Sequence, residues 1–333
     1  MERRRFLALA ATTALLAAGC GRWLGERTDD GPAGDAAPER SDVGPGRDDV
    51  DNGDDNGSGD ADGDRTQPDD HDTPDADSDP TDDEPESQAE QDTGPPDDLD
   101  EHELDPDLLD AQPQEWGERV TGVRTRLDTD EPVIALTFDA CGGSGGNGYD
   151  AQLIEQLRAA AVPATLFLNA RWLEANRATA RQLADDELFE LANHGTEHRP
   201  ISVTGRTAYG ISGTTSAQAV VDEVLGCQRL LTALDGAPPR HFRAGTAYGD
   251  EVAVAIVRDL GLEVVNFDVL GDAGATFSAT EVERALLGAR SGSIALLHMN
   301  HPGSGTAAGV AAAIPQLRDR GFSFTTLGDH RLA

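Results

Sequence analysis

Between residues 133 and 326, short β-forming runs alternate with segments whose apolar residues recur at helical spacing. The first run, residues 133–138, is mostly apolar and ends in a glycine-rich loop, which is typical of a buried strand. Strict alternation predicts a parallel sheet with helical crossover connections, and six to eight such units favour a small α/β barrel over an open sheet. The expected strands are residues 133–138, 164–168, 188–192, 241–242, 263–267, 293–297 and 322–326. The expected helices are residues 149–161, 171–183, 217–234, 250–260, 280–289 and 307–320.

The part of the chain before this pattern has a different composition. From about residue 26 to residue 115 it consists mainly of Asp, Glu, Gly, Pro, Ser, Thr and Gln, with almost no aromatic or β-branched residues. Such a stretch cannot bury enough apolar surface to offset its chain entropy, so we expect disorder. We therefore divide the mature chain into a disordered acidic tether, residues 21–115, and one folded domain, residues 116–333. As a flexible coil, the tether would span about 50 Å.

The charge of the chain indicates the salt content of its surroundings and not a binding partner. All 26 basic residues are arginines, the formal net charge is −36, and the isoelectric point is about 4.3. Dense carboxylates of this kind are typical of proteins from salt-loving organisms, where salt reduces the Debye length to roughly 3 Å at 1 M. We interpret the acidity as adaptation, and it argues against nucleic acid as a partner.

The N-terminus is interpreted as an export signal, residues 1–20. A charged start is followed by an apolar run from Ala8 to Ala18, which is too short to span a bilayer comfortably. The segment from Arg3 to Leu7 is similar to the twin-arginine pattern, and residues 17–20 are similar to a lipobox that ends at Cys20. We expect export by the twin-arginine route, lipidation of Cys20 and anchoring to the outer face of the cell membrane by this lipid alone. A plain transmembrane anchor or a chance cysteine is the alternative.

Polar clusters follow the expected strands at the ends where parallel barrels build their sites. Taken singly, each has an ordinary explanation. An Asp after a strand is usually a helix cap, an Arg can form a structural ion pair, and a His can lie in the core. His194 and His198 are more specific, because two imidazoles four residues apart can converge on one metal, although an isolated pair of this spacing usually lies on the surface. The clusters are Asp139–Gly143, Asn193–Pro200, Arg243–Gly249, Asp272, which we assign to the end of the strand of residues 263–267, and His298.

In their order, these clusters resemble the motifs of the NodB-homology polysaccharide deacetylases, of the carbohydrate esterase family 4 type, over about residues 130–333. The first motif, Thr-Phe-Asp-Asp, is matched up to Asp139, but Ala140 replaces its second Asp. His194 and His198 match the His-x-x-x-His motif. Phe242-Arg243 keeps the start of Phe-Arg-Pro-Pro-Tyr without the prolines or the aromatic residue. Asp272 matches the fourth motif without its usual Trp, and Leu296-Leu297-His298 matches Leu-x-His.

The resemblance implies a NodB-type distorted (β/α)7 barrel and a role for each matched residue. His194 and His198 would hold a divalent metal, zinc in the first place, with cobalt, nickel or manganese as alternatives. Asp139 would be the general base, oriented by Arg243. His298 would be the general acid, its charged form stabilised by Asp272. The backbone N–H of Thr246 would stabilise the oxyanion, and Leu296 would line the pocket for the acetyl methyl group.

Ala140 is the main departure from this pattern, because the missing Asp is the third metal ligand of the family. Water, Asp139 or Cys141 could take its place. Cys141 has another candidate use, since Cys141 and Cys227 are the two cysteines that remain after lipidation of Cys20 in an oxidising compartment. We prefer a disulfide between Cys141 and Cys227. His301 is a further candidate ligand, although a loop histidine is the simpler interpretation.

Two functions follow from the resemblance. The first is a metal-assisted hydrolase that removes N-acetyl or O-acetyl groups from a cell-surface or extracellular polysaccharide. The second is a catalytically impaired lipoprotein of the same fold that binds polysaccharide without turnover. Retention of Asp139, Arg243, Asp272 and His298 favours the enzyme, because a decayed site would more often lose its acid or base.

Overall fold

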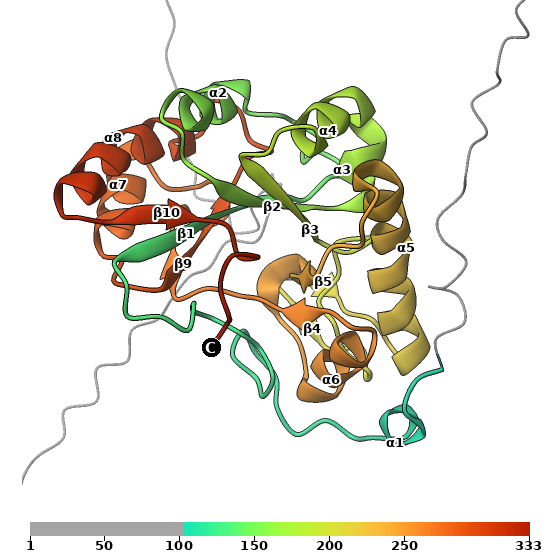
Figure 1. Ribbon diagram of the computed structural model, residues 1–333. Coiled ribbons are helices and arrows are strands. Elements are labelled where there is room, and N and C mark those ends of the chain that lie inside the picture. Colours follow the sequence, from blue (N-terminus) through green and yellow to red (C-terminus); the bar gives the residue numbers. More distant parts are fainter. Residues whose placement is uncertain (1–102) are drawn as a thin grey trace, which may run out of the picture. The chain divides into compact units, whose positions relative to one another are not determined.

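The computed structural model describes residues 103–333 of the protein (Figure 1). The helices are α1 (Pro106–Leu109), α2 (Ala151–Ala159), α3 (Ala170–Ala175), α4 (Arg177–Ala184), α5 (Ala217–Asp235), α6 (Glu251–Asp259), α7 (Ala279–Leu287) and α8 (Thr306–Asp319). The strands are β1 (Val133–Ala140), β2 (Ala164–Leu168), β3 (Phe189–Asn193), β4 (Thr207–Ala208), β5 (Ile211–Ser212), β6 (His241–Phe242), β7 (Glu263–Val264), β8 (Val269–Leu270), β9 (Ser293–His298) and β10 (Ser323–Thr325). Each predicted strand and helix is represented in this order, so the alternation was interpreted correctly.

The parallel strands form one sheet around β1. Their order is β7-β6-β3-β2-β1-β9-β8, and β10 pairs with the first part of β1. All eight residues of β1 are buried, as expected for a central parallel strand that is covered on both faces. Because every pairing within this sheet is parallel, the carboxyl ends of the strands lie at one edge.

The sheet curls into a half-barrel, which confirms the predicted α/β fold of NodB type. Its terminal strands β7 and β8 follow each other in the chain, with only residues 265–268 between them. At one end of this link, Val265 N donates to Phe242 O of β6 at 2.8 Å, and at the other, Asp268 N donates to Ile294 O of β9 at 3.2 Å. The chain thus passes directly from one end of the strand order to the other.

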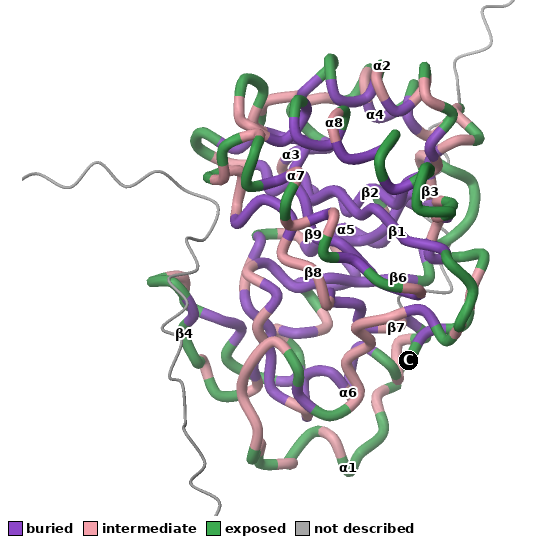
Figure 2. Tube along the Cα trace, turned by 90° about the vertical axis from the view of Figure 1, so that its left-hand side faces the viewer, coloured by how far each residue is buried: buried purple, intermediate pink, exposed green. Residues whose placement is uncertain are grey.

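Strand residues alternate between an outer and an inner apolar layer. In β1, Ile134, Leu136 and Phe138 belong to the layer that is covered by α2, α7 and α8. Ala135 belongs to the inner layer, together with Phe167 of β2. Figure 2 shows the buried strands between partly exposed helices. Side chains with odd numbers in β1 therefore point into the half-barrel.

Side-chain caps set the beginnings of several helices. Asp150 accepts a hydrogen bond from Leu153 N before α2, and Ser216 accepts one from Ala219 N before α5. Ser278 and Glu281 form a capping box at the start of α7. The long helix α5 ends at Gly236, whose φ of 74° is a conformation that glycine adopts at little cost.

The structure also differs from the sequence-based expectation. The predicted helix of residues 171–183 is two helices, because Asn176 has non-helical angles, φ −126° and ψ 35°, between α3 and α4. The hairpin β4–β5 and strand β8 were not predicted. Asp272 therefore follows β8. We had expected it to follow the strand of residues 263–267.

Residues 103–115 pack on the domain, so the folded part begins before the predicted boundary at Trp116. Leu104, Leu108 and Ala111 contact the apolar cluster that α6 helps to form, and Glu115 N donates to Glu251 Oε2 at 2.8 Å. The predictions for the signal peptide, Arg3 and Arg4, Cys20 and most of the tether lie outside the described residues. Among residues 103–333, no helix is long and apolar enough to cross a membrane.

Candidate active site

The matched polar residues gather at the carboxyl edge of the sheet. Asp139 in β1 and His298 in β9 are Cα partners in the parallel pairing, so their side chains leave neighbouring strands on the same face. On the other side of β1, Ala140 pairs with Leu168 of β2, which in turn pairs with Asn193 of β3. The register therefore places the first and fifth motifs on adjacent strands, with the second motif on β3 beyond β2, all at the carboxyl edge where we expected them.

Asp139 forms a buried ion pair with Arg243. Arg243 Nη1 donates to Asp139 Oδ1 at 2.7 Å, and neither side chain is more than 5% exposed. Arg243 also donates to Thr137 Oγ1 at 2.9 Å and to the carbonyls of Val265 and Asn266. Its guanidinium lies 4.0 Å from the centroid of the Phe167 ring. Burial lowers the pKa of Arg243, and the charge and hydrogen bond of Asp139 oppose this shift. The predicted orienting role of Arg243 thus has a geometric basis.

His298 is held in the same way by Asp272. His298 Nδ1 lies 2.8 Å from Asp272 Oδ1, and a carboxylate can only accept, so Nδ1 carries the proton. Asp272 Oδ2 accepts from His298 N at 2.7 Å and from Thr306 Oγ1 at 2.9 Å. Asp272 is completely buried. These bonds fix the orientation of the ring and the position of its Nδ1 proton.

His194 has a defined tautomer. Its Nδ1 lies 2.9 Å from the carbonyl oxygen of Arg243, which must accept, so Nδ1 carries a proton. In the neutral ring Nε2 therefore presents a lone pair, and it lies 3.8 Å from Cys141 Sγ and 3.6 Å from Asp139 Oδ2. A histidine that donates through one nitrogen to a carbonyl is oriented to ligate a metal through the other.

A buried glutamate shapes the loop between the two histidines. Glu223 in α5 accepts hydrogen bonds from Glu197 N and Arg199 N, both next to His198. Burial raises the pKa of Glu223, although these two N–H groups act in the opposite direction. Gly195 has a φ of +79°, and a Cβ there would lie 2.4 Å from Glu223 Oε1. The loop can therefore approach α5 only with glycine at this position.

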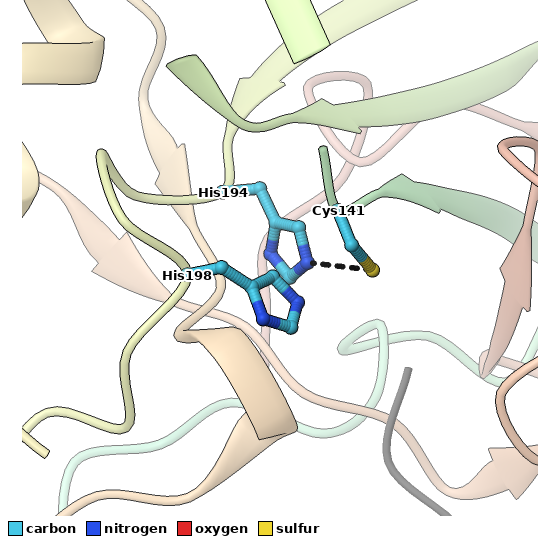
Figure 3. Close-up of side chains that lie close together, drawn as sticks. All are labelled: Cys141, His194 and His198. Carbon is cyan, nitrogen blue, oxygen red and sulfur yellow. Dashed lines mark hydrogen bonds between the residues drawn. The ribbon is translucent and has the colours of Figure 1, made fainter. Parts of the chain in front are cut away.

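Cys141, His194 and His198 converge, as Figure 3 shows. Their ligand atoms lie within 4.8 Å of one another, and all three residues are buried. The rings of His194 and His198 are 4.8 Å apart in an edge-to-face arrangement. Ligands of a tetrahedral zinc ion lie about 3.5 Å apart, so a thiolate and two imidazoles at these separations fit zinc after small movements. Three protein ligands would leave a fourth position open, as in catalytic zinc sites.

This arrangement corrects the predicted disulfide. Cys141 and Cys227, both among the described residues, are not bonded to each other. Cys141 Sγ faces His194, whereas Cys227 Sγ donates to the carbonyl of Leu168 at 3.1 Å. Burial raises the pKa of Cys227, so its thiol stays protonated. Of the three replacements considered for the missing carboxylate, the geometry favours Cys141.

Ala140 packs in the outer apolar layer and not in the inner layer. It is completely buried and belongs to the outer apolar layer, together with Phe138 and Leu168. Leu296 is 7% exposed and belongs to the inner layer. Thr246 has a φ of +73° in a short 3-10 turn, and His301 lies in the loop that follows β9. Neither Thr246 nor His301 has a contact that tests the role considered for it.

Three supporting residues were not identified from the sequence. They are Glu223, Thr306, and Asn169, whose Nδ2 donates to the carbonyls of His194 and Gly195 at 3.0 and 2.6 Å. Glu223 carried a signal, because it lies beside the apolar stripe of its helix at Val220 and Val224. Thr306 and Asn169 resemble ordinary helix-start residues, so the sequence alone gave no reason to select them.

Comparison with known proteins gives a family match over the region that holds most of the site. Residues 126–265 match the sequence profile of the polysaccharide deacetylase family. This span includes Asp139, His194, His198 and Arg243 but ends before Asp272 and His298. The uncharacterized protein YlxY of Bacillus subtilis (strain 168) is 24% identical over 200 residues, which is 60% of this chain and 57% of that protein. The chain thus spans just over half the length of this curated relative.

Solved structures share the fold. Wild-type BA3943 from Bacillus anthracis, described as a CE4 family pseudoenzyme, superimposes with a TM-score of 0.54 at 20% identity, over 66% of this chain and 70% of that one. A BA3943 mutant, described as having restored enzymatic activity, gives 0.54 at 21% identity over 66% and 72%. The Bc1960 peptidoglycan N-acetylglucosamine deacetylase gives 0.52 at 21% identity over 63% and 92%. At these identities the likeness concerns the fold, so activity has to be argued from the residues.

Proposed function

We propose that the protein is a metal-assisted hydrolase that removes acetyl groups from a polysaccharide, with N-acetylated amino sugars as the first candidate and O-acetyl groups as the second. One observation carries the proposal. Asp139 and His298 are register partners on neighbouring strands, and each is fixed by its own buried partner beside the Cys141, His194 and His198 cluster. A base, an acid and a metal-binding group gathered at one site can together carry out amide hydrolysis.

The metal would be held by Cys141, His194 and His198. The thiolate favours zinc or cobalt over manganese, because soft sulfur ligands bind hard cations weakly. When bound, such an ion acts as a Lewis acid that polarises the acetyl carbonyl. The backbone N–H of Thr246 remains our candidate for a hydrogen bond to the developing oxyanion, and Leu296 for contact with the acetyl methyl group.

Asp139 is the base. Its Oδ1 is held by Arg243, so Oδ2 accepts the proton from the attacking water while the new C–O bond forms at the acetyl carbon. Arg243 cannot give up its position readily, because three further hydrogen bonds hold its guanidinium. The base is therefore oriented before substrate binds.

His298 is the acid. Its Nδ1 keeps its own proton and donates a hydrogen bond to Asp272, while the proton on Nε2 passes to the leaving nitrogen as the C–N bond breaks. The products are acetate and a free amine on the sugar. With an O-acetyl substrate the same proton would go to the leaving alcohol oxygen. Reprotonation of His298 and loss of the Asp139 proton to solvent complete the cycle.

We further propose that the domain acts outside the cell, exported by the twin-arginine route and anchored through Cys20 by the acidic tether. The support is the sequence of residues 1–20 alone. Replacing Arg3 and Arg4 by Lys should retain the precursor in the cytoplasm, and Cys20→Ser should release the protein from membranes. Unchanged membrane fractions in both variants would contradict this location.

A polysaccharide-binding protein without turnover is the second candidate. Ala140 favours it, since the carboxylate of the resembled motif is missing and the position lies in the apolar outer layer. The similar fold of BA3943, which is described as a CE4 family pseudoenzyme, supports this candidate.

Acetate release separates the two candidates. The full chain would be incubated in concentrated salt with an N-acetylglucosamine polymer, peptidoglycan and an O-acetylated xylan. Release that stops with a chelator and returns with zinc supports the hydrolase. Binding of a glycan with no acetate release from any substrate would reject the hydrolase in favour of the binding protein.

A further inference from the structure

Three aromatic side chains from distant segments, Trp116, Tyr209 and Tyr248, meet at the loop that carries Thr246. The Trp116 and Tyr248 rings are 5.8 Å apart, and the Tyr209 and Tyr248 rings are 5.4 Å apart in an edge-to-face arrangement. The whole chain has only three Trp and three Tyr, so half of them gather here. Core packing does not explain the cluster, because Tyr209 is 40% exposed.

Tyr209 lies at the tip of the hairpin β4–β5 in a left-handed backbone conformation that bulky residues rarely adopt. Its φ is +51°, and Gly210 follows with a φ of +77°. Two left-handed residues form the type of tight hairpin turn that favours Asn-Gly, and a bulky side chain at the first position is strained. The hairpin would form more easily with Asn, so the turn itself gives no reason for a tyrosine.

A shallow, solvent-open depression of about 510 Å³ lies against this cluster, lined by residues 115–120 and Tyr248. Two charged groups accompany the rings. Tyr209 Oη donates to Glu118 Oε1 at 3.4 Å, and the Arg206 guanidinium lies 4.9 Å from the centre of the Trp116 ring. Burial raises the pKa of Glu118, while Tyr209 and Arg119 lower it. Aromatic faces match the apolar C–H faces of sugar rings, and carboxylate and guanidinium groups match their hydroxyls.

The cluster is joined to the catalytic machinery through Asn266. The side-chain amide of Asn266 donates to the carbonyls of Glu118 and Ala247, at 2.6 and 2.9 Å. The backbone carbonyl of Asn266 accepts from Arg243 Nη2 at 3.2 Å, and Arg243 holds Asp139. Tyr248 itself belongs to the loop that carries Thr246. Two residues, Asn266 and Arg243, therefore connect Glu118 beside the aromatic cluster to the base Asp139 through hydrogen bonds.

We propose that Trp116, Tyr209 and Tyr248 form a glycan subsite that binds sugar units next to the one being deacetylated. The proposal rests on the proposed function and specifies its substrate as a chain of several sugar units. Tyr209 supplies an exposed ring at the hairpin tip, Trp116 and Tyr248 form the wall behind it, and Glu118 and Arg206 bind hydroxyls.

The test measures binding and not turnover. The full chain carrying Asp139→Asn would be titrated with the hexamer and the dimer of β-1,4-linked N-acetylglucosamine by calorimetry, in concentrated salt. Tyr209→Asn removes the ring and keeps a residue that the turn favours, so it should weaken hexamer binding about tenfold and dimer binding much less. Tyr209→Phe keeps the ring and should lose less. Leu230→Ala is the matched control, since Leu230 is a similarly exposed apolar residue of α5.

Each outcome decides one question. Hexamer affinity that is unchanged in Tyr209→Asn, or lost equally in Leu230→Ala, would overturn the subsite, even if the protein without these substitutions releases acetate. Loss of hexamer affinity confined to Tyr209→Asn supports it, even if no acetate is ever released and the hydrolase proposal fails. No hexamer binding by Asp139→Asn protein that circular dichroism shows to be folded would also overturn the subsite.

Discussion

Two acids face strand β6 from inside the half-barrel, one at each edge of the sheet. At the amino edge, His241 Nδ1 lies 2.8 Å from Glu190 Oε1, and at the carboxyl edge, Arg243 Nη1 lies 2.7 Å from Asp139 Oδ1. Glu190 Oε2 also accepts from Thr165 Oγ1 at 2.8 Å and from Gly328 N at 3.0 Å. Asp139 Oδ2 instead lies 3.6 Å from His194 Nε2, which is longer than a hydrogen bond.

This difference between the two ion pairs indicates which pair contributes to stability and which contributes to the reaction. Both oxygens of Glu190 are satisfied by groups of the fold itself. Burial alone would raise the pKa of Glu190, but the hydrogen bond and charge of His241, with the Gly328 N–H, hold that pKa below 4.5. Asp139 keeps one oxygen directed at the metal cluster, beside the acid His298. We infer that the amino edge holds the sheet together and the carboxyl edge carries out the reaction.

The largest expected effect follows from removing the base. Asp139→Asn should reduce acetate release by about 10²- to 10⁴-fold, because an amide cannot accept the proton of the attacking water. The unfolding free energy should also fall, because Arg243 would keep a fully buried charge without a carboxylate. Circular dichroism must therefore show that the variant is folded at the assay temperature. Turnover at the wild-type rate in folded Asp139→Asn would remove this residue from the mechanism.

Ala140→Asp tests whether the carboxyl edge lacks only the carboxylate of the resembled motif. The new charge would enter the apolar outer layer, so we expect a loss of about 3 kcal/mol of stability and no gain in zinc affinity while Cys141 is present. Urea unfolding and zinc titration measure the two quantities. Tighter zinc binding with faster acetate release would show instead that residue 140 reaches the metal, and that Cys141 is not its replacement.

Glu190→Gln sharpens the comparison from the other edge. It removes the charge that His241 and the Gly328 N–H bind, so the unfolding free energy at neutral pH should fall by about 1–3 kcal/mol, with acetate release unchanged at 25 °C. Because the folded-state pKa of Glu190 is lowered, its contribution is present above 4.5 and is lost as the pH falls through that lowered value. The difference between wild type and variant should therefore shrink below about pH 4.5.

The matched control is Glu187→Gln, an exposed carboxylate that precedes the same strand. It should change the unfolding free energy by less than about 0.5 kcal/mol and leave the pH dependence of wild type intact. An equal loss in both variants would mean that the effect arises from net charge and not from the buried pair.

The sequence predicted which residues gather at the carboxyl edge better than it predicted their strands and side-chain directions. Alternation of β-forming and helical segments is a property of long stretches, so it placed Asp139, His194, Arg243 and His298 at one edge correctly. Strand β8 has only two residues, too few for a periodic signal, and Asp272 was therefore assigned to the wrong strand.

Side-chain direction was the part that the sequence could not fix. Cys141 starts a glycine-rich loop in which Gly142 and Gly143 have φ values of +69° and +76°, so no strand periodicity applies to it. The expectation of export to an oxidising compartment favoured a disulfide between Cys141 and Cys227, but the loop turns Cys141 toward His194. Glu223 was missed because an acidic residue on an amphipathic helix is expected to face solvent. Only the structure shows that it is buried and hydrogen-bonded.

Absorption of the cobalt(II)-loaded protein tests the central claim most directly, namely that Cys141 completes a metal site at the carboxyl edge. The measurement would use Cys20→Ser protein, in which Cys141 and Cys227 are the remaining thiols. Titration should give one bound cobalt ion per chain with a thiolate-to-metal charge-transfer band, which Cys141→Ser removes and Cys227→Ala leaves in place. A chain that binds no cobalt, or binds it with no such band, would contradict the account.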